Sequence, residues 1–315
     1  MSNKRLLFTS KFPFFLYVHG EGFDYIFSYA QGGLESLVKN GYEWLYRCPK
    51  PTFWRALTDN DRGSKFHIKS GSWLAADMFI DCKDVEVITD GVSQGKPCAP
   101  ENNKYGGDVF ADEITVKYTY ETVTTPATTV DVTYHVAEKG KITVNVSYKG
   151  VQGLPQLPVF GLRFIMSTLA DKYMYEGLSG ETYPDRKAGA VKGVYEIDDL
   201  SLTPYLVPQE CGMRMDTDWL EVTRHTSLDN SRKDNSDQVL RIEKEKDTFA
   251  YDQHHLTISA FTFLTEQINI MISSRCLYIV WVKTICKQIF VVIRAGGILI
   301  NSKLRIKSVC FIINS

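Results

Sequence analysis

The chain has 315 residues, of which 44% are hydrophobic and 23% are charged, and its formal net charge is −1. This length allows one large domain or two ordinary ones, and the composition is typical of a soluble globular protein. The near-neutral charge argues against electrostatic binding of nucleic acid, and no run of about 18 uncharged apolar residues is present to span a membrane. Seven cysteines without a Cys-x-x-Cys pair indicate reduced thiols, so we expect a cytoplasmic protein.

Short apolar clusters alternate with turn residues from position 23 to position 47. The dipeptide Asn40-Gly41 stands between two of these clusters. Asn-Gly between apolar runs is the strongest short-range signal for a β-hairpin. We therefore expect two antiparallel strands joined at this point.

Residues 47–63 predict a rigid connection that ends in an acidic loop. Two prolines stiffen the approach, and the aromatic pair Phe53-Trp54 can anchor it in a core. The polar run Asp59-Asn60-Asp61, closed by Gly63, indicates a turn in which Gly supplies a positive φ. These side chains suit a cation or sugar hydroxyls, but no Glu completes a calcium loop. A network of Asx turns is the alternative.

A polar stretch from residue 63 to residue 72 has glycine near both ends, which is the composition of a mobile lid. Residues 73–79 follow it, and we expect a short helix there.

Period-two alternation marks the clearest β-region, between residues 113 and 148. β-Branched and aromatic residues alternate with polar ones over 114–120, 130–136 and 142–148, which predicts three half-buried strands in a meander. Further strands are expected over 159–166, 173–176, 219–225 and 239–242. Few helical periods occur, so the predicted class is all-β.

The last part of the sequence has a different composition. Residues 267–315 contain no Asp, Glu or Pro, but seven Lys or Arg and twelve Ile. We therefore divide the chain into a domain over 1–250 and a basic, apolar tail over 251–315. We interpret the tail as the product of a shifted reading frame or a damaged gene. The alternative is a divergent pair of final buried strands.

Four ordered motifs resemble the C-terminal domain of bacterial β-galactosidases of glycoside hydrolase family two, and the small subunit of the two-gene enzymes of lactic acid bacteria. The first motif has the pattern Phe-Trp-Arg-Ala-x-Thr-Asp-Asn-Asp-x-Gly and covers residues 53–63. The others cover residues 154–164, 175–186 and 203–212. The resemblance runs from about residue 23 to about residue 250. It implies a large antiparallel two-sheet supersandwich, similar to galactose mutarotase.

The resemblance also implies a function. Retaining glycosidases use two carboxylates about 5–5.5 Å apart, and in this family both lie in a barrel that this chain lacks. We therefore expect no catalytic residue and no metal ligand here. A large subunit would hydrolyse β-galactosides such as lactose, and the magnesium and sodium of the assembled enzyme would belong mainly to that partner.

The site residues expected from the resemblance form two groups. The loop next to the substrate comprises Asp59, Asn60, Asp61, Arg62, Gly63 and Ser64. The structural motif residues are Trp54, Arg55, Glu181, Tyr183, Asp185 and Arg186. We expect Glu176, Glu181 and Glu210 to be structural carboxylates that accept backbone N–H groups or pair with Arg163 and Arg186. The tryptophan that the family contributes near the C-terminus is not matched by Trp281, for which we expect a core position.

Two other functions stay open. A stand-alone aldose epimerase would need a His and a carboxylate facing one sugar, and His67, His135 and His225 lie in no such motif. The other function is that of a non-catalytic sugar-binding or structural module, or an inactive relic of the small subunit. Asp252, His254 and His255 suggest a metal patch, but no third ligand on one face of a strand is evident.

Overall fold

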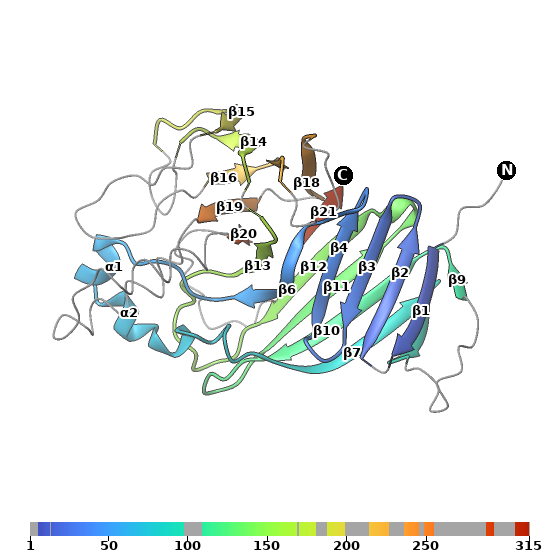
Figure 1. Ribbon diagram of the computed structural model, residues 1–315. Helices are drawn as coiled ribbons and strands as arrows, with labels where there is room; N and C mark the ends of the chain where they lie inside the picture. Colours follow the sequence, from blue (N-terminus) through green and yellow to red (C-terminus); the bar gives the residue numbers. More distant parts are fainter. Residues whose placement is uncertain are drawn as a thin grey trace, which may run out of the picture.

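The computed structural model of the chain describes residues 6–12, 14–97, 109–168, 170–180, 188–198, 214–226, 236–245, 249–254, 288–292 and 306–314. Within these residues the protein consists of antiparallel β-strands and four short helical segments (Figure 1). The all-β class predicted from the sequence is confirmed. No helix in this part of the chain combines the length and the apolar character needed to cross a membrane.

The first sheet is built from the N-terminal strands. It has six strands in the order β5-β4-β3-β2-β1-β9. Their bounds are β1 Leu6–Phe12, β2 Phe15–Gly20, β3 Phe23–Ser28, β4 Gly33–Lys39, β5 Tyr42–Glu43 and β9 Val109–Ala111. The hairpin expected at Asn40-Gly41 is confirmed between β4 and β5. Both turn residues are left-handed, with φ of 50° and 75°, as two-residue hairpin turns of this kind require.

The second sheet contains the predicted meander. It has ten strands in the order β15-β14-β17-β18-β21-β12-β11-β10-β7-β8. Their bounds are β7 Asp81–Thr89, β8 Val92–Gly95, β10 Ile114–Glu121, β11 Thr129–Val136, β12 Ile142–Lys149, β14 Lys172–Leu178, β15 Lys192–Ile197, β17 Trp219–Arg224, β18 Gln238–Lys244 and β21 Ile306–Asn314. Buried and half-buried residues alternate strictly along β10 and β11, so the sequence pattern corresponds to one core face and one solvent face.

The third sheet has five strands in the order β16-β19-β20-β13-β6. Their bounds are β6 Leu45–Thr52, β13 Gly161–Met166, β16 Arg214–Thr217, β19 Phe249–His254 and β20 Gln288–Val292. The edge strand β6 contains Pro49 and Pro51, which is where proline is tolerated because it cannot donate to a ladder. This strand leads directly to the candidate site.

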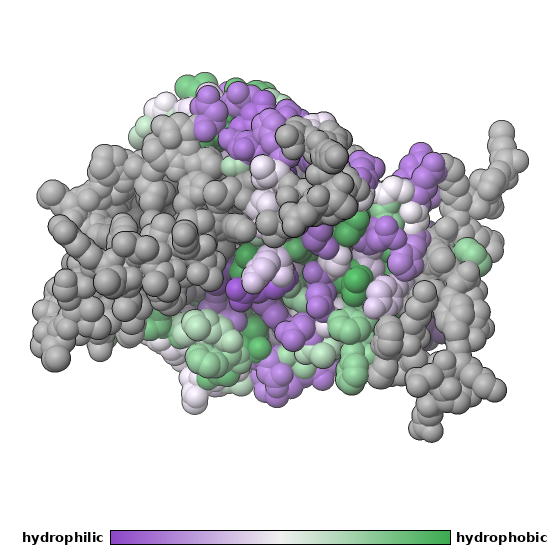
Figure 2. Space-filling model, in the orientation of Figure 1, coloured by the Kyte–Doolittle hydropathy of each residue, from purple (hydrophilic) through white to green (hydrophobic). Residues whose placement is uncertain are grey.

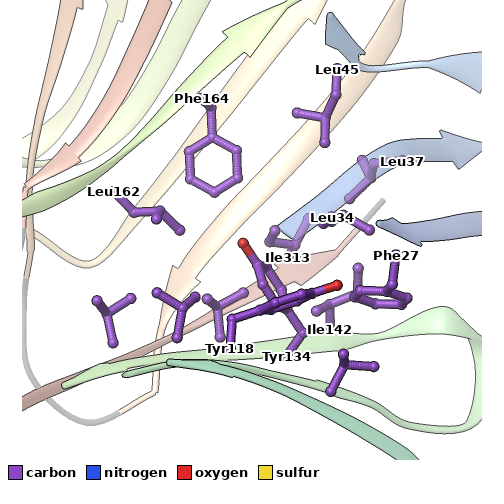
Figure 3. Close-up of a cluster of buried hydrophobic side chains, with 14 of the residues drawn as sticks. Phe27, Leu34, Leu37, Leu45, Tyr118, Tyr134, Ile142, Leu162, Phe164 and Ile313 are labelled. Carbon is purple, nitrogen blue, oxygen red and sulfur yellow. The ribbon is translucent and has the colours of Figure 1, made fainter. Parts of the chain in front are cut away.

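The three sheets form two layers around a shared core. In Figure 3, Phe27 and Leu34 of the six-stranded sheet and Leu162 and Phe164 of β13 face Tyr118 of the ten-stranded sheet. The six-stranded and five-stranded sheets thus lie over the same face of the ten-stranded sheet. The sequence predicted two sheets, whereas the structure has three: the ten-stranded sheet forms one layer, and the six-stranded and five-stranded sheets together form the other.

The helix expected over residues 73–79 is wrong. The structure has a 3₁₀ helix, η1, over Gly71–Trp73, followed by turns. Ala75 adopts a left-handed φ of 60°, which an α-helix cannot accommodate. The other helical segments are α1 Asp59–Gly63, α2 Phe66–Lys69 and the 3₁₀ helix η2 Glu138–Gly140.

The described pieces of the C-terminal tail belong to the sheets. β20 pairs with β13 and β19, and β21 lies between β12 and β18. Ile313 on β21 is buried in the common core. The boundary at residue 250 and the shifted reading frame remain predictions. The region around Trp281 lies outside the described residues.

Candidate functional site

The segment after β6 is anchored by aromatic packing. Phe53 is fully buried, and its ring centroid lies 5.3 Å from that of Trp73 and 6.1 Å from that of Phe160. Trp54 is also buried, and so are all residues from Arg55 to Thr58. The chain therefore reaches α1 as a fixed segment of the core.

The acidic stretch itself is a short helix and not a turn closed by glycine. Thr58 is the N-cap of α1: its Oγ1 accepts from the Asp61 N–H at 3.2 Å, and the Asp61 carboxylate accepts from the Thr58 N–H at 2.8 Å. This reciprocal pair is a capping box. Gly63 is the last helical residue, and the left-handed residue is Lys65, with a φ of 57°. The Thr-x-x-Asp spacing is the sequence signal that could have predicted this helix.

Asp61 also binds Arg55 through two contacts. Arg55 Nη1 lies 2.5 Å from Oδ2, and Arg55 Nη2 lies 3.1 Å from Oδ1. The exposed fractions of the Arg55 and Asp61 side chains are 8% and 13%, so the ion pair is largely shielded from water. Burial by itself raises the pKa of Asp61, but the hydrogen bonds and charge of Arg55 and the bonds to Thr58 outweigh it and lower that pKa. Asp61 thus fixes the orientation of α1 from its inner side.

Asp59 and Asn60 lie on the outer side of α1. The Asp59 side chain is 70% exposed and pairs with Arg62 at 3.0 Å. Asn60, Gly63 and Ser64 are exposed as well. Because Asp61 points inward while Asp59 and Asn60 are exposed, the three oxygen-bearing side chains do not form one ligand set. Among the described residues no three His, Cys, Asp or Glu side chains are arranged to hold a metal ion.

Residues 66–80, which we call the apolar segment, are held by contacts with residues 155–163 of the same chain. Ser70 Oγ donates to the Gln156 carbonyl at 2.8 Å, and Trp73 Nε1 donates to the Pro155 carbonyl at 3.0 Å. The carboxylate of Asp77 pairs with Arg163, which also donates to Thr52 Oγ1 at 3.0 Å. The lid expected over residues 63–72 stays a prediction.

Glu176 makes a side-chain contact within its sheet, and Arg186, one of the partners expected for these carboxylates, lies outside the described residues. Glu176 lies on β14 and accepts from Trp219 Nε1 at 2.8 Å, whereas Arg163 pairs with Asp77. Asp77 and Arg163 are 86 residues apart, so no local pattern in the sequence indicated their contact. The remaining predicted residues Glu181, Tyr183, Asp185, Arg186 and Glu210 lie outside the described residues.

Arg224 is a buried cation that lies in no sequence motif described above. Its guanidinium lies 4.3 Å from the ring centroid of Trp44 and donates to Ser167 Oγ and to the Glu43 carbonyl. Burial lowers the pKa of Arg224 to about 10, although Glu43 and Tyr42 act in the opposite direction. Arg224 and Trp44 join β17 to the β5–β6 corner.

The histidines considered for an epimerase lie on separate elements. His67 is on α2, and His135 on β11 contacts Thr115 Oγ1 at 2.9 Å. His225 lies beyond the end of β17 between Asp171, at 2.8 Å, and Asp237, at 2.7 Å. Asp252 and His254 are on β19, and His255 lies outside the described residues. The contacts of His135 and His225 are those of surface hydrogen bonds and ion pairs.

Comparison with known proteins gives a consistent result. Residues 19–271 match the family described as β-galactosidase small chain. The chain is 55% identical over 232 residues to the β-galactosidase small subunit of Latilactobacillus sakei, covering 74% of this chain and 73% of that protein. It is 40% identical over 180 residues to the β-galactosidase of Clostridium acetobutylicum and 32% identical over 197 residues to that of Streptococcus thermophilus. These matches cover 57% and 62% of this chain, but only 18% and 17% of the longer relatives.

Proposed function

Because the chain belongs to the β-galactosidase small chain family, we propose that it is one subunit of a heteromeric β-galactosidase and helps to complete its active site. The reaction is hydrolysis of terminal non-reducing β-D-galactose residues, such as that of lactose. One observation carries the proposal. The same sequence matches a separate small subunit over most of its length and under one fifth of longer β-galactosidases. The remaining four-fifths of such an enzyme would be supplied by a large chain.

The outer side of α1 is the part of this chain that we assign to the substrate side. Asp59, Asn60 and Ser64 expose polar groups suited to sugar hydroxyls. Asp61 supports the arrangement from below, since its contacts with Arg55 and Thr58 hold the helix to the core. A rigid support of this kind is what a site assembled from two chains needs.

The two catalytic carboxylates belong to the partner in this proposal. The described side chains also do not fit a metal site, because both oxygens of Asp61 are engaged and Asp59 pairs with Arg62. We therefore assign the magnesium and sodium of the assembled enzyme to the large chain. A cytoplasmic location is part of the proposal and is supported by the free thiols Cys48 and Cys82.

Hydrolysis of a chromogenic β-galactoside tests this function. The large chain alone, this chain alone and their mixture are compared at equal concentrations. Activity that is much higher in the mixture than in either chain supports the proposal. A mixture no more active than the large chain alone, together with glycan binding by this chain, would replace the proposal with a sugar-binding module.

A further inference from the structure

The apolar segment, residues 66–80, has an inner side that is firmly held. Trp73 and Ala76 are fully buried. The bonds of Ser70 to Gln156 and of Trp73 to Pro155, together with the ion pair of Asp77, join this segment to β13 and the chain that precedes it. The backbone between Ser70 and Asp77 is therefore held in place, and side chains on its other side cannot turn inward without breaking these contacts.

The outer side of the same segment exposes large apolar side chains. Ile68 is 67% exposed, Met78 72% and Phe79 65%. Apolar area also shows along the lower edge of the face seen in Figure 2, where the chain in Figure 1 runs from α2 towards β7. Single exposed apolar residues are ordinary, but three on one anchored segment of 15 residues are a reason to consider it as an interaction surface.

Basic residues accompany these apolar ones. Lys65, the N-cap of α2, and Lys69, its last residue, are both exposed, and α2 contains no acidic residue. A matching partner surface therefore has an apolar centre and an acidic rim. α2 lies beside α1, so this surface continues from the side of the protein that we assigned to the substrate (Figure 1).

The relatives indicate what covers this surface. In the longer β-galactosidases, the part matched by this chain is under one fifth of a single polypeptide. The rest of such a polypeptide is available there to bury apolar residues of the matched part. For a separate small chain, a large subunit can provide the equivalent cover.

We propose that Ile68, Met78 and Phe79 dock onto an apolar, acid-rimmed surface of the β-galactosidase large chain. This inference rests on the proposed function and adds to it the face through which the two chains associate. If Met78 and Phe79 are buried at the centre of this interface, the affinity between the two chains should depend most on them.

The test measures association and not activity. The large subunit that partners the Latilactobacillus sakei small subunit is titrated with the full chain by isothermal calorimetry. Met78→Asp and Phe79→Asp are compared with Phe110→Asp, whose side chain is 54% exposed on β9, at the other end of the protein from α2 (Figure 1). All three positions are exposed, so the folded state should tolerate each change, and circular dichroism checks this.

We expect the first two variants to weaken association by about tenfold or more, and the Phe110 variant by less than about twofold. Hydrogen exchange should also show protection of residues 66–80 when the wild-type chains are mixed. Wild-type association with unchanged affinity in both variants would overturn the docking face while leaving the proposed function intact. Failure of the wild-type chains to associate would overturn both. Self-association of the wild-type chain that is lost in Phe79→Asp would assign the surface to a second copy instead.

Discussion

Replacing Asp61 by Asn tests how α1 is held to the core. The substitution keeps the size of the side chain but removes its charge, so the Arg55 guanidinium loses the charge of this partner. The Arg55 side chain is only 8% exposed, so the ion pair is lost at a largely buried cation. The capping bond from the Thr58 N–H is weakened at the same time.

The expected cost follows from these contacts. Removing one partner of a fully buried ion pair costs about 3–5 kcal/mol. Asp61 retains 13% exposure, and Asn still offers one acceptor oxygen, so we expect a loss of about 2–3 kcal/mol in the free energy of unfolding. Asp59→Asn is the matched control. Its side chain is 70% exposed, and its pair with Arg62 should contribute less than about 1 kcal/mol.

Urea unfolding followed by circular dichroism measures both variants, and pH provides a second check. Because the pKa of Asp61 is lowered in the folded protein, its contribution is complete above the unfolded value of about 3.9 and is lost as pH falls through the native pKa. The difference between wild type and Asp61→Asn should therefore shrink below about pH 4. Equal destabilisation by the two substitutions at pH 7, or a difference independent of pH, would refute this reasoning.

Two further predictions concern other contacts. Tyr120→Phe removes a buried hydroxyl that donates to the Gly32 carbonyl at 2.7 Å. Because Lys50 also donates to that carbonyl at 3.1 Å, the free energy of unfolding should fall by only about 1 kcal/mol. Urea unfolding measures this loss, with Tyr46→Phe at an exposed position as the control, and an unchanged stability would contradict the hydrogen bond. The pKa of His225 is raised by its hydrogen bond to Asp171 and by the charges of Asp171 and Asp237. The contribution of protonated His225 to folding stability should therefore be present below about pH 6.5 and be lost as pH rises through its native pKa. An NMR titration that gives an unshifted pKa for His225, or the same pKa in wild type and Asp237→Asn, would disprove these contacts.

The parts of the fold that could be predicted from the sequence are those set by local pattern. The meander over β10, β11 and β12 followed from strict alternation, because each strand has one core face and one solvent face. The hairpin at Asn40-Gly41 followed from the left-handed backbone that its turn requires. Both features depend only on neighbours within a few residues.

The features that were missed depend on distant partners or on competing local signals. The contacts of Asp77 with Arg163 and of Trp44 with Arg224 join residues far apart in the sequence, so they depend on how the sheets are arranged. Residues 73–79 resemble a helix in composition, but burial of Trp73 and Ala76 and the left-handed Ala75 impose turns. At α1, Gly63 predicted a loop. The structure has a helix there instead, because Thr58 and Asp61 form a capping box that begins it.

The central claim, that this chain completes a β-galactosidase, is tested most directly by a titration of activity. A fixed amount of the large chain is mixed with increasing amounts of this chain, and hydrolysis of a chromogenic β-galactoside is recorded. The account predicts a rate that rises with the concentration of this chain and then saturates, with no hydrolysis by this chain alone. A rate that stays at the level of the large chain throughout the titration would contradict it.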